Sequence, residues 1–167
     1  MSAALLIATS ASAQHEIGGI VGGLNGASYK YWFNDAMAIQ ADLAVGLTAA
    51  YGGVYYQGTN LGEGQMDLYD FTLNPNFLYH FDLPQNFKIY TGGGVNLGMY
   101  SGLNGGGNVA GKFGVNAVAG FSYDIQSAPV VLACDFRPGY GLGFTTADDA
   151  HISFFDWKVA FAVRYRF

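Results

Sequence analysis

A chain of 167 residues is long enough for one domain but too short for two, so a single core has to account for the fold. The composition is 51% hydrophobic and 16% aromatic with only 11% charged residues, which is too little charge to cover an ordinary water-facing surface. The 7 basic and 12 acidic residues exclude nucleic acid as a partner, because nucleic-acid binding needs a basic face.

The first segment of the chain is predicted to be a secretory signal peptide over residues 1–13. Residues 3–8 form a short apolar core, and Ala11-Ser12-Ala13 supplies the small residues that signal peptidase requires before Gln14. The segment has no positively charged start, so we expect that the true start of the signal peptide lies upstream of Met1. The remaining residues, 14–167, are predicted to form one domain.

Sequence periodicity after residue 14 favours β-strands over helices. No run of about 18 apolar residues follows the signal peptide, which argues against a helical membrane protein. From Asp156 to Phe167 the odd positions are large and apolar, whereas the even positions are small or charged. A closed β-barrel is the other structure that satisfies every backbone polar group inside lipid.

Eight segments fit this pattern, and their connections alternate in length as in outer-membrane barrels. The predicted strands are 16–24, 27–33, 36–49, 68–81, 87–100, 111–124, 130–144 and 153–167. Short turns are expected at 34–35, 82–86 and 126–129, and longer loops at 51–67, 101–110 and 145–152. The first hairpin is a misfit, because its turn near Asn25-Gly26 is tight although it belongs to the long-loop side. Pro75 and Pro138 fall inside strands, where they predict bulges or strand ends.

The inner face of such a barrel is predicted to be filled by charged side chains, because eight strands leave no aqueous channel. We expect a network of ion pairs there, since unpaired charges would be costly. Its predicted members are Asp42, Asp70, Lys88, Lys112, Asp135, Arg137, Lys158, Arg164 and Arg166. A selective solute pathway through this interior is the alternative. The single cysteine, Cys134, excludes an intramolecular disulfide and a CxxC zinc site, and we expect it to face lipid or the core.

The chain resembles the small bacterial outer-membrane barrels typified by OmpX and by the transmembrane domain of OmpA. The resemblance rests on the strand count, the signal peptide and the ending Trp157…Tyr165-Arg166-Phe167, and Asp135-Phe136-Arg137-Pro138-Gly139 is similar to an element of some porin-like barrels. It implies an all-β, eight-stranded antiparallel up-and-down barrel, integral to the bacterial outer membrane. It also implies that Phe167 is the signal read by the barrel-assembly machinery.

One segment resembles a catalytic site. His151-Ile152-Ser153 is similar to the His-x-Ser pair of outer-membrane lipid A deacylases, in which a histidine activates a serine for acyl transfer. The acidic partner of that family is missing here, since Val163 stands near its place.

The sequence therefore predicts a non-enzymatic outer-membrane barrel without cofactor or metal, with outer-membrane lipids as its surroundings. A structural or adhesion role is expected, with any extracellular partner bound through loops 51–67 and 145–152. Two alternatives stay open: a lipid-modifying acyl hydrolase that uses His151 and Ser153, and a soluble lipocalin-like barrel that binds an apolar ligand.

Overall fold

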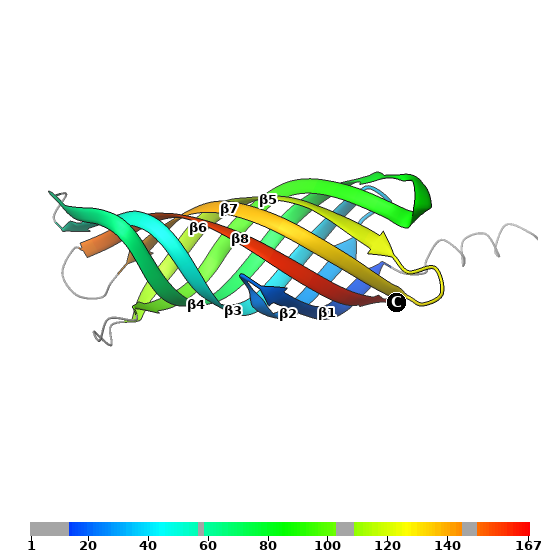
Figure 1. Cartoon of the computed structure of the whole chain (residues 1–167), viewed down its shortest axis with the longest axis horizontal. Coiled ribbons are helices and arrows are strands. Elements are labelled where there is room, and N and C mark those ends of the chain that lie inside the picture. Colours follow the sequence, from blue (N-terminus) through cyan, green and yellow to red (C-terminus); the bar gives the residue numbers. More distant parts are fainter. Residues whose placement is uncertain (1–13, 57–58, 103–108, 145–149) are drawn as a thin grey trace, which may run out of the picture.

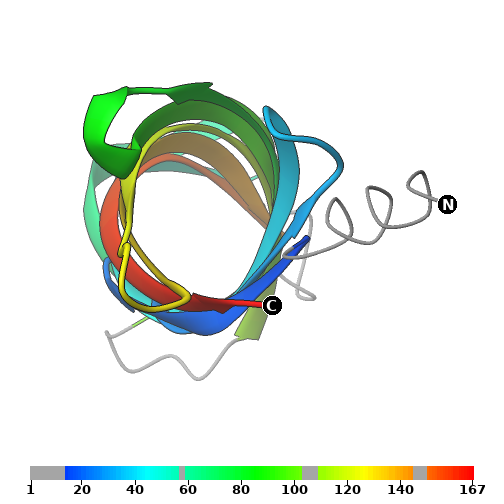
Figure 2. The same ribbon diagram turned by 90° about the vertical axis from the view of Figure 1, so that its right-hand side faces the viewer.

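Eight antiparallel strands form a closed barrel in the computed structural model, which describes residues 14–56, 59–102, 109–144 and 150–167 (Figure 1). The strands are β1 (His15–Gly22), β2 (Asn25–Trp32), β3 (Met37–Tyr56), β4 (Thr59–Asp82), β5 (Phe87–Gly102), β6 (Val109–Asp124), β7 (Val130–Phe144) and β8 (Ala150–Arg166). Each strand pairs with its neighbours in sequence, and β1 pairs with β8 to close the ring (Figure 2). The predicted signal peptide, residues 1–13, lies outside the described residues.

One end of the barrel, which we call the base, holds the start of β1, the end of β8 and the short turns. The turns lie between β2 and β3, between β4 and β5, where a single 3₁₀ turn (Pro84–Asn86) is found, and between β6 and β7. The opposite end is called the top. Among the described residues there is no helix long and apolar enough to cross a membrane.

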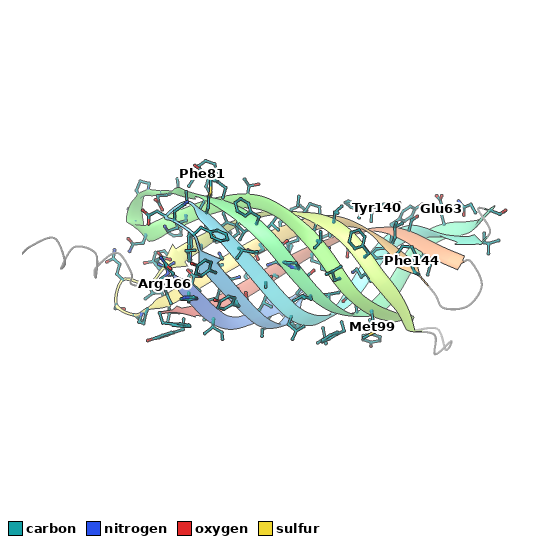
Figure 3. All side chains as sticks on the ribbon, turned by 180° about the vertical axis from the view of Figure 1, so that it is seen from behind. Glu63, Phe81, Met99, Tyr140, Phe144 and Arg166 are labelled. Carbon is teal, nitrogen blue, oxygen red and sulfur yellow. The ribbon has the colours of Figure 1, made fainter. Side chains whose placement is uncertain are left out.

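The predicted alternation of side chains is confirmed along the strands. In β8, Trp157 and Phe161 are 61% and 56% exposed, whereas Ala160 is 0% exposed. Phe81 near the base and Met99 near the top both project outward (Figure 3). In β7 the odd-numbered side chains point inward and Cys134 lies on the outer face, half-buried. The outer wall is therefore apolar and the interior is polar.

The wall is not uniform, because β1 and β2 are only 8 residues long. Above their hairpin, β3 pairs directly with β8, from Ala50 opposite Asp156 to Tyr56 opposite Ala150. The barrel thus has eight strands near the base and six, β3 to β8, near the top. This taper explains the tight first hairpin: its turn ends below the top and needs no long loop.

The turn of the β1–β2 hairpin is at Gly23-Leu24, so the predicted position at Asn25-Gly26 is wrong by two residues. The reason is that the Asn25 side chain closes the turn instead of occupying it. Asn25 Oδ1 accepts from the Gly22 N–H at 3.2 Å, and its Nδ2 donates to the Gly22 carbonyl at 3.0 Å. The Gly23 N–H donates to the Val159 carbonyl at 2.8 Å. The Gly22 N–H and carbonyl and the Gly23 N–H thus have partners within the protein, as backbone groups next to lipid require.

The predicted loop over residues 51–67 is wrong for most of its length. β3 continues to Tyr56 and β4 begins at Thr59, and the two strands pair throughout this hairpin with one register shift after Val54. Glycines and polar residues weaken the alternation here, because a hairpin beyond the apolar wall needs no apolar face. The predicted loops 101–110 and 145–152 are shorter for the same reason, with 103–108 and 145–149 outside the described residues.

The predicted bulges at Pro75 and Pro138 are also absent. The β4–β5 pairing is interrupted at Asn74 and Pro75, and the β6–β7 pairing at Arg137 and Pro138. The register is the same on both sides of each interruption, so no residue is inserted. Each proline keeps its pairing with its other neighbour, opposite Ala41 or Trp157.

The closed turn generates a prediction. Asn25→Ala leaves the Gly22 N–H and carbonyl without their side-chain partner in an apolar setting, and should lower the free energy of unfolding by about 1–3 kcal/mol. Urea unfolding in lipid vesicles, followed by tryptophan fluorescence, measures this.

Asn60→Ala is the matched control. Asn60 accepts from the Gly62 N–H at 2.9 Å in the top hairpin, where water can replace it, so a change below about 0.5 kcal/mol is expected. Equal losses in the two variants would show that the β1–β2 turn is not shielded from water.

Candidate functional site

The interior of the barrel is the candidate site, because it collects every basic residue of the chain. Five of the 7 basic residues are less than 9% exposed, and the other two line the base. The buried set is Lys30, Lys112, Arg137, Lys158 and Arg164, and the pair at the base is Lys88 and Arg166. Acidic side chains enter the interior from neighbouring strands and form three levels of ion pairs.

The first level lies at the base, where Arg166 joins two carboxylates. It contacts Glu16 at 2.7 Å and Asp124 at 2.7 Å. Glu16 also accepts from the Trp32 indole at 2.9 Å. The pairing of β1 with β8 sets Glu16 opposite Arg166, so this contact ties the closing strands together. Lys88 pairs with the more exposed Asp82 at 2.7 Å.

The second level, in the eight-stranded part, is centred on Arg137. Its guanidinium bridges Asp42, at 2.6 Å, and Asp135 on its own strand. The Tyr90 hydroxyl donates to Asp135, and the Gln40 amide donates to Asp42 at 2.9 Å. Both carboxylates are 1% exposed or less, so each depends on these donors.

The third level lies where the β1–β2 hairpin ends. Asp70 accepts from Lys112 at 2.9 Å and from Lys158 at 3.0 Å. Asp156 contacts Lys158 at 3.1 Å and Lys112 at 3.6 Å. Two cations and two carboxylates thus neutralise one another at the level where the barrel narrows from eight strands to six.

Phe154 occupies the six-stranded part of the interior and is 1% exposed. Its neighbours on both sides, Gly52 and Gly141, have no side chains to compete with it. A Cβ added at Gly141 would lie 2.6 Å from the Phe154 ring. The Lys112 ammonium lies 5.1 Å from the centre of this ring, which therefore caps the third level.

The nine residues predicted from the sequence thus take different places. Asp42, Asp135 and Arg137 meet in the second level, and Asp70, Lys112 and Lys158 in the third. Lys88 and Arg166 are at the base, and Arg164 forms no ion pair with a described residue. Sequence reasoning missed Glu16, Lys30, Asp124 and Asp156, although the even numbering that they share with their strands' inner faces was a usable signal.

The His-x-Ser segment lies in β8 near the top. Ser153 is partly exposed and stands opposite Leu142 of β7, and the side chain of His151 lies outside the described residues. Asp156 points into the barrel and is occupied by two lysines, so it does not orient a catalytic histidine. Val163 is an outward apolar residue, 55% exposed. In the described part of the chain, no cluster of three or more histidine, cysteine or acidic residues is arranged to hold a metal ion.

No protein-family model matches this sequence, and no curated protein matches it. Among solved structures, the chain is similar to Neisserial surface protein A, with 18% identity and a TM-score of 0.57 over 92% of this chain and 93% of that one. It is also similar to the outer membrane protein OprG of Pseudomonas aeruginosa, with 12% identity and a TM-score of 0.57 over 93% and 97%. The chain therefore has the fold of the small outer-membrane β-barrels, as its resemblance to OmpX and OmpA predicts.

The buried network generates a prediction. Arg137→Met leaves two buried carboxylates without their cation and should lower the free energy of unfolding by about 3–5 kcal/mol. Lys88→Met breaks a pair whose side chains are 19% and 70% exposed, and should cost less than about 1 kcal/mol. Urea unfolding in vesicles compares the two variants.

Adding Asp42→Asn to Arg137→Met should restore part of the lost free energy of unfolding, because it removes the unpaired charge of the Asp42 carboxylate. If Arg137→Met costs the same whether or not Asp42→Asn is also present, Arg137 does not act by neutralising that carboxylate.

Proposed function

We propose that this protein is a non-enzymatic integral barrel of the bacterial outer membrane, with a structural or adhesive role at its extracellular end. The observation that carries the proposal is the separation of charge: the outer wall is apolar around the ring, and every basic residue lies in the interior or at its base. Such a wall fits hydrocarbon and not water. In this assignment the base is periplasmic and the top is extracellular.

The contents of the interior support a structural role over transport. Ion pairs lie in the eight-stranded part, and Phe154 lies in the narrower six-stranded part above it. An eight-stranded barrel is just wide enough for its own side chains, and six strands enclose less. A solute would have to displace paired charges from their partners before it could pass.

The β3–β4 hairpin supports the adhesive role. Its residues 51–56 and 59–67 extend beyond the first pairing of β4 with β5, at Leu68, so they stand above the rest of the wall on that side (Figure 1). Tyr51 and Leu61 are 62% and 65% exposed, and Glu63 lies at the end of the barrel opposite Arg166 (Figure 3). A partner of the top would meet this hairpin first.

The base supports recognition by the assembly machinery. Phe167 is 57% exposed and stacks on His15 with ring centres 5.6 Å apart. Its backbone N–H donates to the His15 carbonyl at 2.9 Å, so the terminal residue belongs to the closing seam. We propose that this aromatic end is the feature that the machinery reads.

The two alternatives fare differently. The soluble lipocalin-like barrel is contradicted, because apolar side chains point outward and the polar ones inward. Among the described residues no contact favours the acyl hydrolase, since Asp156 is engaged in the interior and Val163 stands where the acidic partner is expected.

Reconstitution tests the proposal. Protein folded into vesicles of outer-membrane lipids should migrate differently on a detergent gel with and without boiling, give no stepwise conductance in a planar bilayer, and leave the mass spectrum of the lipids unchanged. Defined conductance steps would overturn the sealed interior. A lipid mass change that Ser153→Ala abolishes would overturn the non-enzymatic assignment.

A further inference from the structure

Two basic residues of the interior have no carboxylate partner in the part of the chain that the structure describes. The other five all form ion pairs within 4.0 Å, but Lys30 and Arg164 form none with the residues that the structure describes. Both are only 1% exposed. Each basic group is therefore shielded from bulk water and has no carboxylate in direct contact among the described residues, and a positive charge in such a place is costly to bury.

Most of the hydrogen-bond donors on these two side chains are also unused. Arg164 donates from Nε to the Ser28 hydroxyl at 2.8 Å, while its Nη1 and Nη2 are buried without a partner among the described residues. The Lys30 ammonium makes one hydrogen bond, to His80 Nε2 at 3.3 Å, and lies 4.8 Å from the centre of the Tyr90 ring. An ammonium has three donors and a guanidinium five, so several N–H groups need an acceptor.

The strand register brings the two residues to one level of the barrel. Gly18 of β1 stands opposite Ser28 of β2 on one side and opposite Arg164 of β8 on the other. Lys30 follows Ser28 by two positions on the same inner face. The Arg164 and Lys30 charges interact electrostatically, and because they have the same sign they repel each other in this enclosed space.

The nearest carboxylates are already engaged. Glu16 and Asp135 both lie within electrostatic range of Lys30, but Glu16 is held by Arg166 and Asp135 by Arg137. Glu16 Oε2 has no partner among the described residues, so a water between it and Lys30 is the rival occupant. Water would satisfy some donors, but it would leave the repulsion between Lys30 and Arg164 in place.

We propose that a small anion, a halide or inorganic phosphate, binds in the barrel interior between Lys30 and Arg164. Burial of both side chains excludes the headgroup of a lipid, whose acyl chains could not follow it. The anion accepts hydrogen bonds from the Nη groups of Arg164 and from the ammonium of Lys30. It also reduces the repulsion between these two positive charges.

Bromide provides the direct test, because its anomalous scattering locates it. Crystals of the full barrel grown in sodium bromide should give an anomalous peak between Lys30 Nζ and the Arg164 guanidinium. The same position should hold a larger tetrahedral density in crystals grown with phosphate. A neutral water bridging Lys30 and Glu16, with no anomalous peak, would overturn the proposal.

The effect of the anion on the stability of the protein distinguishes a functional site from one that holds an adventitious ion only. Urea unfolding is compared in sodium bromide and sodium gluconate at equal ionic strength. At about 100 times its dissociation constant, bromide should raise the folding equilibrium constant about 100-fold. The effect should vanish in Lys30→Met and persist in Lys88→Met, which removes a lysine of the same size from the base. An anomalous peak without anion-dependent stability would be an adventitious ion only, and would overturn the proposed role.

Discussion

Closure of the sheet by β8 is the constraint on which the rest of the structure depends. In hydrocarbon an open strand edge would leave a row of backbone groups without partners, so the ring has to close along its whole height. β8 does this twice, with β1 from Glu16 opposite Arg166 to Gly22 opposite Ala160, and with β3 above the β1–β2 hairpin. Where the barrel narrows from eight strands to six, the β3–β8 pairing therefore closes the ring a second time, and no gap is left above the β1–β2 hairpin.

The distribution of charge follows from the same constraint. An outer wall in contact with lipid has no place for an ammonium or a guanidinium, so the basic residues are confined to the interior and the base. Carboxylates from neighbouring strands then have to meet them, and they do so at three levels. These pairs occupy the interior at three levels, and they support the structural role proposed for the barrel.

The sequence was sufficient for the parts of the fold that depend on local alternation. From Asp156 to Phe167, small and charged residues alternate strictly with large apolar ones, so the sequence shows which side chains share each face of the strand. The upper β3–β4 hairpin could not be predicted in this way. Its strands pair through the backbone beyond the apolar wall, so their sequence has no regular alternation of polar and apolar residues. The pairing of β3 with β8 joins Ala50 to Asp156 across more than half the chain, and only the tertiary structure shows it. Asp156 stands on the even-numbered face of the predicted strand 153–167, but it was not counted in the predicted network, because the sequence does not show that Lys112 and Lys158 lie beside it.

Lipid contact of the odd-numbered face of β8 is the central claim of this account. Single cysteines at positions 159 to 163, each in a Cys134→Ala background, would carry nitroxide labels whose collisions with dissolved oxygen are measured by electron paramagnetic resonance in bilayers. The account predicts high oxygen accessibility at 159, 161 and 163 and low accessibility at 160 and 162, since Ala160 and Ala162 are 0% and 2% exposed. Uniform accessibility, or the opposite alternation, would contradict the assignment of the outer wall to lipid.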